Sequence, residues 1–165
     1  MRRMDEDTFK CLLKPDLYQV FLFTCPATLP YSFAQHPWFV VNQKGNVSRW
    51  EIFWQARYVH IFRWGYLHKD FYKLTQGVEM FLFSQKHFWG PGKLRGYVEG
   101  GEGSVAQRMA AFIENSGETY PHCQTYSLLG PNSNTYVQWV LNNFPGSNLR
   151  LPWNSFGKKK APMLQ

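Results

Sequence analysis

Three side chains whose types could support nucleophilic catalysis stand in otherwise regular, apolar surroundings. His36 opens an apolar run, Glu51 lies inside a second one, and Ser133 comes just before a helical pattern. An imidazole oriented by a carboxylate can act as a general base, and a hydroxyl at a helix start lies near backbone N–H groups that can hold an oxyanion. The residues therefore predict a hydrolase or acyltransferase acting on an amide or ester, with Ser133 as nucleophile, His36 as base and Glu51 orienting it. Strand register decides whether His36 and Glu51 share a face.

Each of these residues also has a purely structural interpretation. Ser133 could cap the helix that follows it. His36 precedes Pro37, which favours an extended backbone, and it could be a half-buried histidine bonded to a main-chain carbonyl. Glu51 could face solvent by simple strand alternation. His68 is the leading substitute for Glu51 as the second polar member of the site.

The cysteines and histidines indicate neither a metal centre nor a cofactor. Cys11, Cys25 and Cys123 form no C-x-x-C pair, and the five histidines lack zinc-binding spacing. We therefore expect no metal and no cofactor, and we interpret the cysteines as small hydrophobic residues. An odd cysteine count, together with an N-terminus that has no apolar leader segment, predicts a cytoplasmic protein.

Short aromatic and β-branched runs separated by turns fill the first half of the chain, which is typical of antiparallel strands. A turn over residues 42–46 joins two of these runs into a hairpin. The predicted strands cover residues 18–24, 38–41, 47–54, 58–64 and 78–83. The six glycines between Gly90 and Gly103 predict a loop that could hold one short strand.

Two helices are predicted in the second half. Ser104 and Gln107 have capping-box spacing ahead of an apolar pattern that reaches Glu114 and stops at Gly117. A second helix runs over residues 135–144 and ends at Pro145-Gly146; its apolar residues lie on more than one face, so we expect it to be buried. Strands first and helices later predict an α+β fold, an antiparallel sheet packed against a few helices.

Length, composition and charge indicate the number of domains and which kinds of partner are unlikely. Its 165 residues, 44% apolar and 18% charged, predict one folded domain over residues 1–157, followed by a loose basic tail over 158–165. The net charge of +7 owes three charges to the lysines at 158–160, so a nucleic-acid partner is unlikely. The longest apolar stretch of the first half covers residues 20–23, and no transmembrane segment is predicted.

Several of these motifs occur together in a known group. Over roughly residues 29–158 the sequence resembles an uncharacterised bacterial group, domain-of-unknown-function family 3750 (DUF3750), most specifically in its long Gly-Pro-Asn-Ser-Asn-Thr element. The matching elements are His36-Pro37-Trp38-Phe39-Val40-Val41, Trp50-Glu51, Trp64-Gly65-Tyr66-Leu67-His68, Tyr120-Pro121, Gly130-Pro131-Asn132-Ser133-Asn134-Thr135-Tyr136 and Leu151-Pro152-Trp153-Asn154-Ser155-Phe156-Gly157-Lys158.

More distantly, the order of polar residues is similar to that of circularly permuted papain-like proteins, the group of NlpC/P60 peptidases and lecithin:retinol acyltransferase-like enzymes. In that group a His opens a strand, a polar residue lies on the next strand, and a Cys begins the central helix. The resemblance implies a permuted papain-like arrangement with His36 and Glu51 in the earlier roles. It places Ser133 at the nucleophile position, with supporting residues Asn132, Asn134 and Thr135. Here serine replaces the cysteine, and a hydroxyl, unlike a thiol, stays protonated near neutral pH.

That departure supports a second hypothesis, a catalytically inactive papain-like domain that binds a small molecule, peptide or lipid, or a partner protein. The 30 aromatic residues would suit such a binding cleft.

Overall fold

The computed structural model describes residues 3–53, 66–81, 86–123 and 125–162, and it has an α+β fold. The strands are β1 (Tyr18–Pro26), β2 (Gln35–Gln43), β3 (Asn46–Phe53), β4 (Tyr66–Lys69) and β5 (Lys93–Gly100). The α-helices are α1 (Glu6–Lys10), α2 (Val105–Glu114), α3 (Ser116–Thr119) and α4 (Ser133–Asn143), and two 3-10 helices follow, η1 (Pro145–Ser147) and η2 (Lys158–Lys160). No helix within these described ranges is long and apolar enough to cross a membrane.

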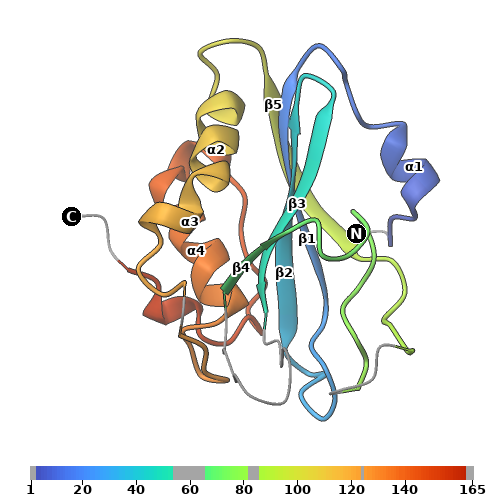
Figure 1. Ribbon diagram of the computed structural model, residues 1–165, viewed down its shortest axis with the longest axis vertical. Helices are drawn as coiled ribbons and strands as arrows, with labels where there is room; N and C mark the ends of the chain where they lie inside the picture. The colour runs from blue at the N-terminus through green and yellow to red at the C-terminus, as the bar shows by residue number, and fades with distance from the viewer. Residues whose placement is uncertain (1–2, 54–65, 82–85, 124, 163–165) are drawn as a thin grey trace.

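The strands form one open antiparallel sheet in the order β4-β3-β2-β1-β5 (Figure 1). A two-residue turn, Lys44 and Gly45, joins β2 to β3, and both residues have positive φ angles, 50° and 92°. This is the backbone of the tight hairpin turns that match the twist of paired strands, and it favours glycine at the second position.

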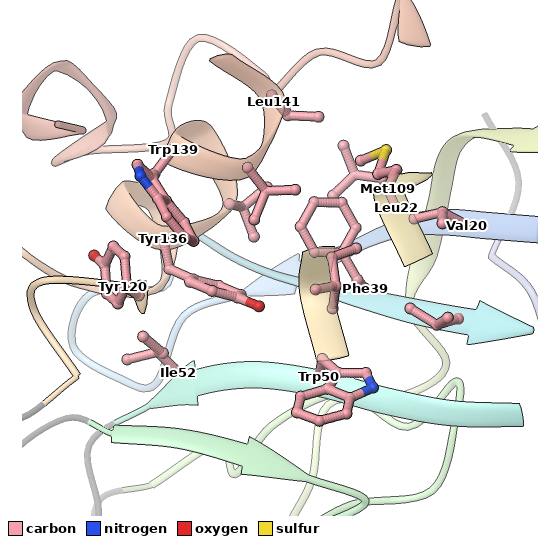
Figure 2. Packing of buried hydrophobic residues seen from close by; sticks show 14 of the residues in the cluster. Val20, Leu22, Phe39, Trp50, Ile52, Met109, Tyr120, Tyr136, Trp139 and Leu141 are labelled. Carbon is pink, nitrogen blue, oxygen red and sulfur yellow. The ribbon is translucent and has the colours of Figure 1, made fainter. Parts of the chain in front are cut away.

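Both faces of the sheet are covered, which explains the unbroken burial of β1 and β2. Odd-numbered residues of β2, such as Phe39, pack under α2 and α4 in the larger core (Figure 2). Even-numbered residues, such as Trp38, pack in a second core with Phe9 of α1 and with loop residues. We call these the helix face and the loop face of the sheet, and this alternation decides which side chains can meet.

The expected strands at 18–24, 38–41 and 47–54 are confirmed in β1, β2 and β3, the last described to Phe53. The expected strand at 58–64 lies outside the described residues. Over 78–81 the strand prediction is wrong, because this segment makes only isolated bridges at Glu79 and Phe81.

The glycine-rich stretch contains β5, a full strand of eight residues paired along β1. The glycine-rich composition did not indicate a strand of this length, because the strand forms by pairing with β1, which is distant in the sequence. A buried central strand such as β1 needs hydrogen-bond partners on both edges, and β5 supplies the second edge.

The helices follow the expected capping signals. The Ser104 hydroxyl accepts a hydrogen bond of 3.1 Å from the Gln107 backbone N–H at the start of α2, as predicted. Helix α4 begins at Ser133, two residues earlier than expected. The lysines at 158–160, expected in a loose tail, form η2, and the ammonium groups of Lys158 and Lys160 donate to the carbonyls of Pro152 and Gly130.

Candidate functional site

A buried polar array of His36, Arg49 and Glu51 lies on the loop face of the sheet. The Nε2 of His36 lies 2.9 Å from Oε2 of Glu51, and Nη2 of Arg49 donates to the same oxygen at 2.9 Å. The Nε of Arg49 is 2.7 Å from Oε1 of Glu51, a charge contact without hydrogen-bond alignment. All three side chains are at least nine-tenths buried. The structure thus brings His36 and Glu51 together.

Strand alternation creates this array. His36 shares the loop face with Trp38 on β2, and Arg49 and Glu51 share it on β3. The register pairs Phe39 with Trp50 across the two strands, so Glu51 lies diagonally from His36, within reach of its side chain.

Arg49 is the member of the array that sequence reasoning missed. Its guanidinium lies 4.2 Å from the ring centre of Trp38, and Nη1 donates to the Lys73 carbonyl at 2.6 Å and to that of Gln76. An arginine two residues before a glutamate, so that both side chains fall on one face of the strand, was the available signal. Two such charges on one side of a buried strand are tolerated as a pair.

The electrostatics of the array keep Glu51 ionised. Burial alone would raise the pKa of this carboxyl, but the positive charge of Arg49 and the hydrogen bond from His36 outweigh it and lower the pKa to about 2. The array is therefore a compensated charge pair that also orients an imidazole.

His68, the proposed substitute for Glu51, is its direct cross-strand neighbour on β4. The side chain is buried, and its ring packs edge-on against Phe71 with 5.1 Å between the ring centres. His68 thus lies beside the array rather than replacing Glu51, whose carboxylate is the group bonded to His36.

Ser133 lies at the first turn of α4, where Asn132 caps the helix. The Asn132 side chain accepts from the backbone N–H groups of Asn134 and Thr135, and the Thr135 hydroxyl accepts from the Asn132 N–H at 3.0 Å. The capping role considered for Ser133 therefore belongs to Asn132. Ser133 itself is buried and makes no hydrogen bond through its hydroxyl within the described ranges.

The other polar residues of this motif hold neighbouring backbone in place. The Asn134 amide donates to the carbonyls of Gln35 at 2.9 Å and Phe156 at 3.0 Å, and the Thr135 hydroxyl donates to that of Gly157 at 2.9 Å. Gly157 has a φ of 91°, and a Cβ there would lie 2.7 Å from the Asn132 amide. The unusual motif thus has an architectural role, because it fixes the last loop against the start of β2.

The imidazole of His36 and helix α4 lie on different faces of the sheet. Helix α4 packs on the helix face, where Tyr136 lies against Phe39, with 6.4 Å between the ring centres. His36 points to the loop face, in the set that contains Trp38 and Cys25. The imidazole of His36 is hydrogen-bonded to Glu51, and its pairing with the Ser133 hydroxyl stays a prediction.

Cys25 is the potential nucleophile nearest to His36 in the register, as its direct cross-strand partner. Its Sγ accepts a 3.4 Å hydrogen bond from the backbone N–H of Val78. Burial raises the pKa of this thiol to about 12, so the sulfur stays protonated near neutral pH. A protonated, buried thiol is the environment of a structural cysteine.

A small pocket lies at the end of the sheet where β1 ends and β2 and β5 begin. Its volume is about 120 Å³. Drug-sized ligands occupy pockets of roughly 300–1,000 Å³, so this one suits a single compact group. The lining residues are Arg3, Thr24, Cys25, Pro26, Gln35, Trp89, Gly90, Pro91, Lys93 and Arg95. We call it the cationic pocket.

Three cations line this pocket, and none of the described residues that line it is acidic. The Nε of Arg95 donates to the Thr24 hydroxyl at 2.7 Å, and its Nη2 donates to Oε1 of Gln35 at 3.1 Å. Partial burial lowers the pKa of Arg95, which reflects the cost of holding a cation there. The sequence analysis missed these residues because they come from the N-terminal segment, three strands and a loop.

Comparison with known proteins gives one match. A family model described as "Protein of unknown function (DUF3750)" matches residues 18–159. No curated protein matches the chain, and no solved structure does.

Proposed function

The chain belongs to the DUF3750 family, and we propose that it is a binding module that takes a small anion, with a phosphate or carboxylate group, into the cationic pocket. The observation that carries this proposal is the excess of positive charge there. Arg3, Lys93 and Arg95 surround about 120 Å³ of space with no acidic residue among its described lining residues. Like charges repel one another, so an anion bound among them is stabilised by all three.

Arg95 is the best candidate for direct contact with the ligand. A guanidinium presents five N–H donors in a planar fork that matches carboxylate and phosphate oxygens. The Thr24 hydroxyl and the Gln35 side-chain oxygen accept from this guanidinium and fix its orientation at the wall of the pocket. Arg3 and Lys93 lie beside each other in an isolated bridge and would supply charge from the other wall.

Binding, rather than catalysis, is the function that this geometry favours. The described residues that line the pocket include no histidine, aspartate or glutamate that could act as a general base. The hydrolase or acyltransferase hypothesis stays a prediction, since the imidazole of His36 bonds Glu51 on the loop face whereas α4, which begins at Ser133, packs on the helix face.

Kinship with permuted papain-like proteins is likewise a proposal. Its support is the chain order, with a histidine at the beginning of one strand, a glutamate on the next, and a buried helix that begins at Ser133. The orientation of His36 away from α4 is the feature that this kinship would have to explain.

The proposal is tested by thermal unfolding of the full chain with sodium phosphate against sodium chloride at matched ionic strength. At a phosphate concentration about tenfold above Kd, binding should raise Tm by roughly 3–6 °C. Lys93→Gln and Arg95→Met should each reduce the rise by more than half, whereas Lys69→Gln, an exposed lysine of β4, should leave it unchanged. An equal rise in all variants, or none in the wild type, would contradict the proposal.

A further inference from the structure

Six large apolar side chains are exposed together near the start of α4. They come from three loops, the β1–β2 connection, the segment before α4 and the segment before η2. They are Tyr31, Phe33, Leu128, Leu129, Trp153 and Phe156, and we call them the aromatic loop surface. Trp153 is 84% exposed and Leu129 is 74% exposed. Exposure of this extent, in neighbouring loops, is unusual for residues without a binding role.

Ring contacts and hydrogen bonds join the three loops into one surface. The rings of Phe33 and Phe156 pack edge-on with 5.8 Å between their centres, and Asn154 donates to the Phe33 carbonyl at 2.8 Å. Asn132 ties the other two loops together, since its amide donates to the carbonyls of Leu128 and Phe156. In Figure 1 these segments lie toward the lower end of the molecule, away from α1.

The three loops that form this surface carry positive charge and no carboxylate side chain. Residues 28–35, 127–134 and 150–161 contain four lysines and arginines and no aspartate or glutamate. The hydrogen bonds of Lys158 and Lys160 to carbonyls of Pro152 and Gly130 hold their ammonium groups against these loops. An ammonium has three N–H donors, so each retains donors for another partner, and Lys159 and Lys160 are exposed.

We propose that the aromatic loop surface docks on the surface of an anionic phospholipid bilayer. Exposed tryptophan, phenylalanine and leucine side chains can insert at the boundary of headgroups and acyl chains, and adjacent lysines bind anionic headgroups. Each contribution alone is weak, and the two together give stable attachment. The absence of carboxylates from all three loops favours an anionic bilayer over a basic or neutral partner. This inference is independent of the anion pocket.

Vesicle flotation of the full chain tests it, with vesicles of pure phosphatidylcholine and of an equimolar mixture of phosphatidylcholine and phosphatidylglycerol. We expect binding to the mixed vesicles to exceed binding to the neutral ones by about tenfold or more. Trp153→Ala should weaken binding to the mixed vesicles by about tenfold, because it removes the most exposed ring. Gln substitution of the lysines at 158, 159 and 160 together should weaken binding to the mixed vesicles by about fivefold for each lysine, which is at least as large a loss as that of Trp153→Ala.

A charge-matched control separates this surface from overall charge. Gln substitution of Lys10, Lys69 and Lys73, all exposed and outside the three loops, removes the same charge and should retain most of the binding. Thermal unfolding of each variant shows whether it is folded. Equal binding to both vesicle types, no binding, or equal loss in the control would overturn the proposal. So would a dimer in sedimentation velocity that Trp153→Ala dissolves, because a second copy would then cover the surface.

Discussion

The polar array and the cationic pocket use the same kinds of side chain under different conditions. In the array, Arg49 is fully buried and meets the carboxylate of Glu51, two backbone carbonyls and the Trp38 ring. In the pocket, Arg95 lies among other cations, and it donates to the Thr24 hydroxyl and to the Gln35 amide oxygen. A buried cation whose charge is neutralised within the chain supports the fold, whereas cations gathered around open space without a carboxylate can bind an anion from outside.

The largest expected effect comes from removing Arg49. Arg49→Met should lower the free energy of unfolding by about 3–5 kcal/mol, since it leaves Glu51 buried without its cation. The matched pocket variant, Lys93→Met, should cost less than about 0.5 kcal/mol because that lysine is exposed. Urea unfolding measures both values. A similar loss of unfolding free energy in the two variants would contradict the claim that the array supports the fold and the pocket does not.

Acid should destabilise the protein through the array. The pKa of Glu51 in the folded protein, about 2, lies below the ordinary glutamate pKa of 4.5. The stabilisation is therefore present above about pH 4.5 and is lost as the pH falls toward 2, on the order of 3 kcal/mol in all. Urea unfolding over this range should show the loss in the wild type and a flatter profile in Glu51→Gln. If the free energy of unfolding fell with pH in the same way in both proteins, another carboxylate would be responsible for the loss of stability in acid.

A smaller effect distinguishes the capping residue from the predicted nucleophile. Asn132→Ala should lower the free energy of unfolding by about 1–2 kcal/mol, because the cap of α4 is lost. Ser133→Ala should cost less than about 1 kcal/mol, since the hydroxyl has no hydrogen bond in the described structure. Urea unfolding compares them. A serine-directed activity probe that labels the wild type but not Ser133→Ala would contradict the separation of Ser133 from His36 and restore the enzyme hypothesis.

The smallest expected effect concerns cysteine reactivity near neutral pH. Cys25 should react with iodoacetamide far more slowly than the exposed Cys11, because burial both raises the pKa of the Cys25 thiol to about 12 and blocks access to it. Mass spectrometry of the native chain over time gives both rates. Rapid labelling of Cys25 would show that the pocket opens widely and holds a more reactive thiol than the structure indicates.

Local patterns predicted much of the fold. The hairpin of β2 and β3 followed from alternation and the turn at Lys44 and Gly45, and α2 followed from Ser104 and Gln107. Strand β5 was anticipated only as one possible short strand in a loop, because its pairing with β1 joins residues about 75 positions apart and the segment is rich in glycine.

In the candidate site, too, local contacts could be predicted from the sequence and long-range contacts could not. The pairing of His36 with Glu51 could be anticipated, since the two residues lie on strands joined by a short hairpin. The side of the sheet on which α4 packs could not, because the order of elements along the chain does not determine it. The cationic pocket could not be predicted from the sequence either. Its lining residues are brought together only when β5 pairs with β1; they include Arg3, Thr24, Gln35 and Arg95.

Amide and arginine side-chain NMR signals of the labelled full chain, followed during titration with inorganic phosphate at constant ionic strength, test the central contrast most directly. We expect saturable shifts for Thr24, Gln35, Lys93 and the Nε–H of Arg95, with little change for Arg49 and Glu51. Signals that stay fixed throughout the titration, or shifts centred on the polar array, would contradict the assignment of the cationic pocket as an anion site.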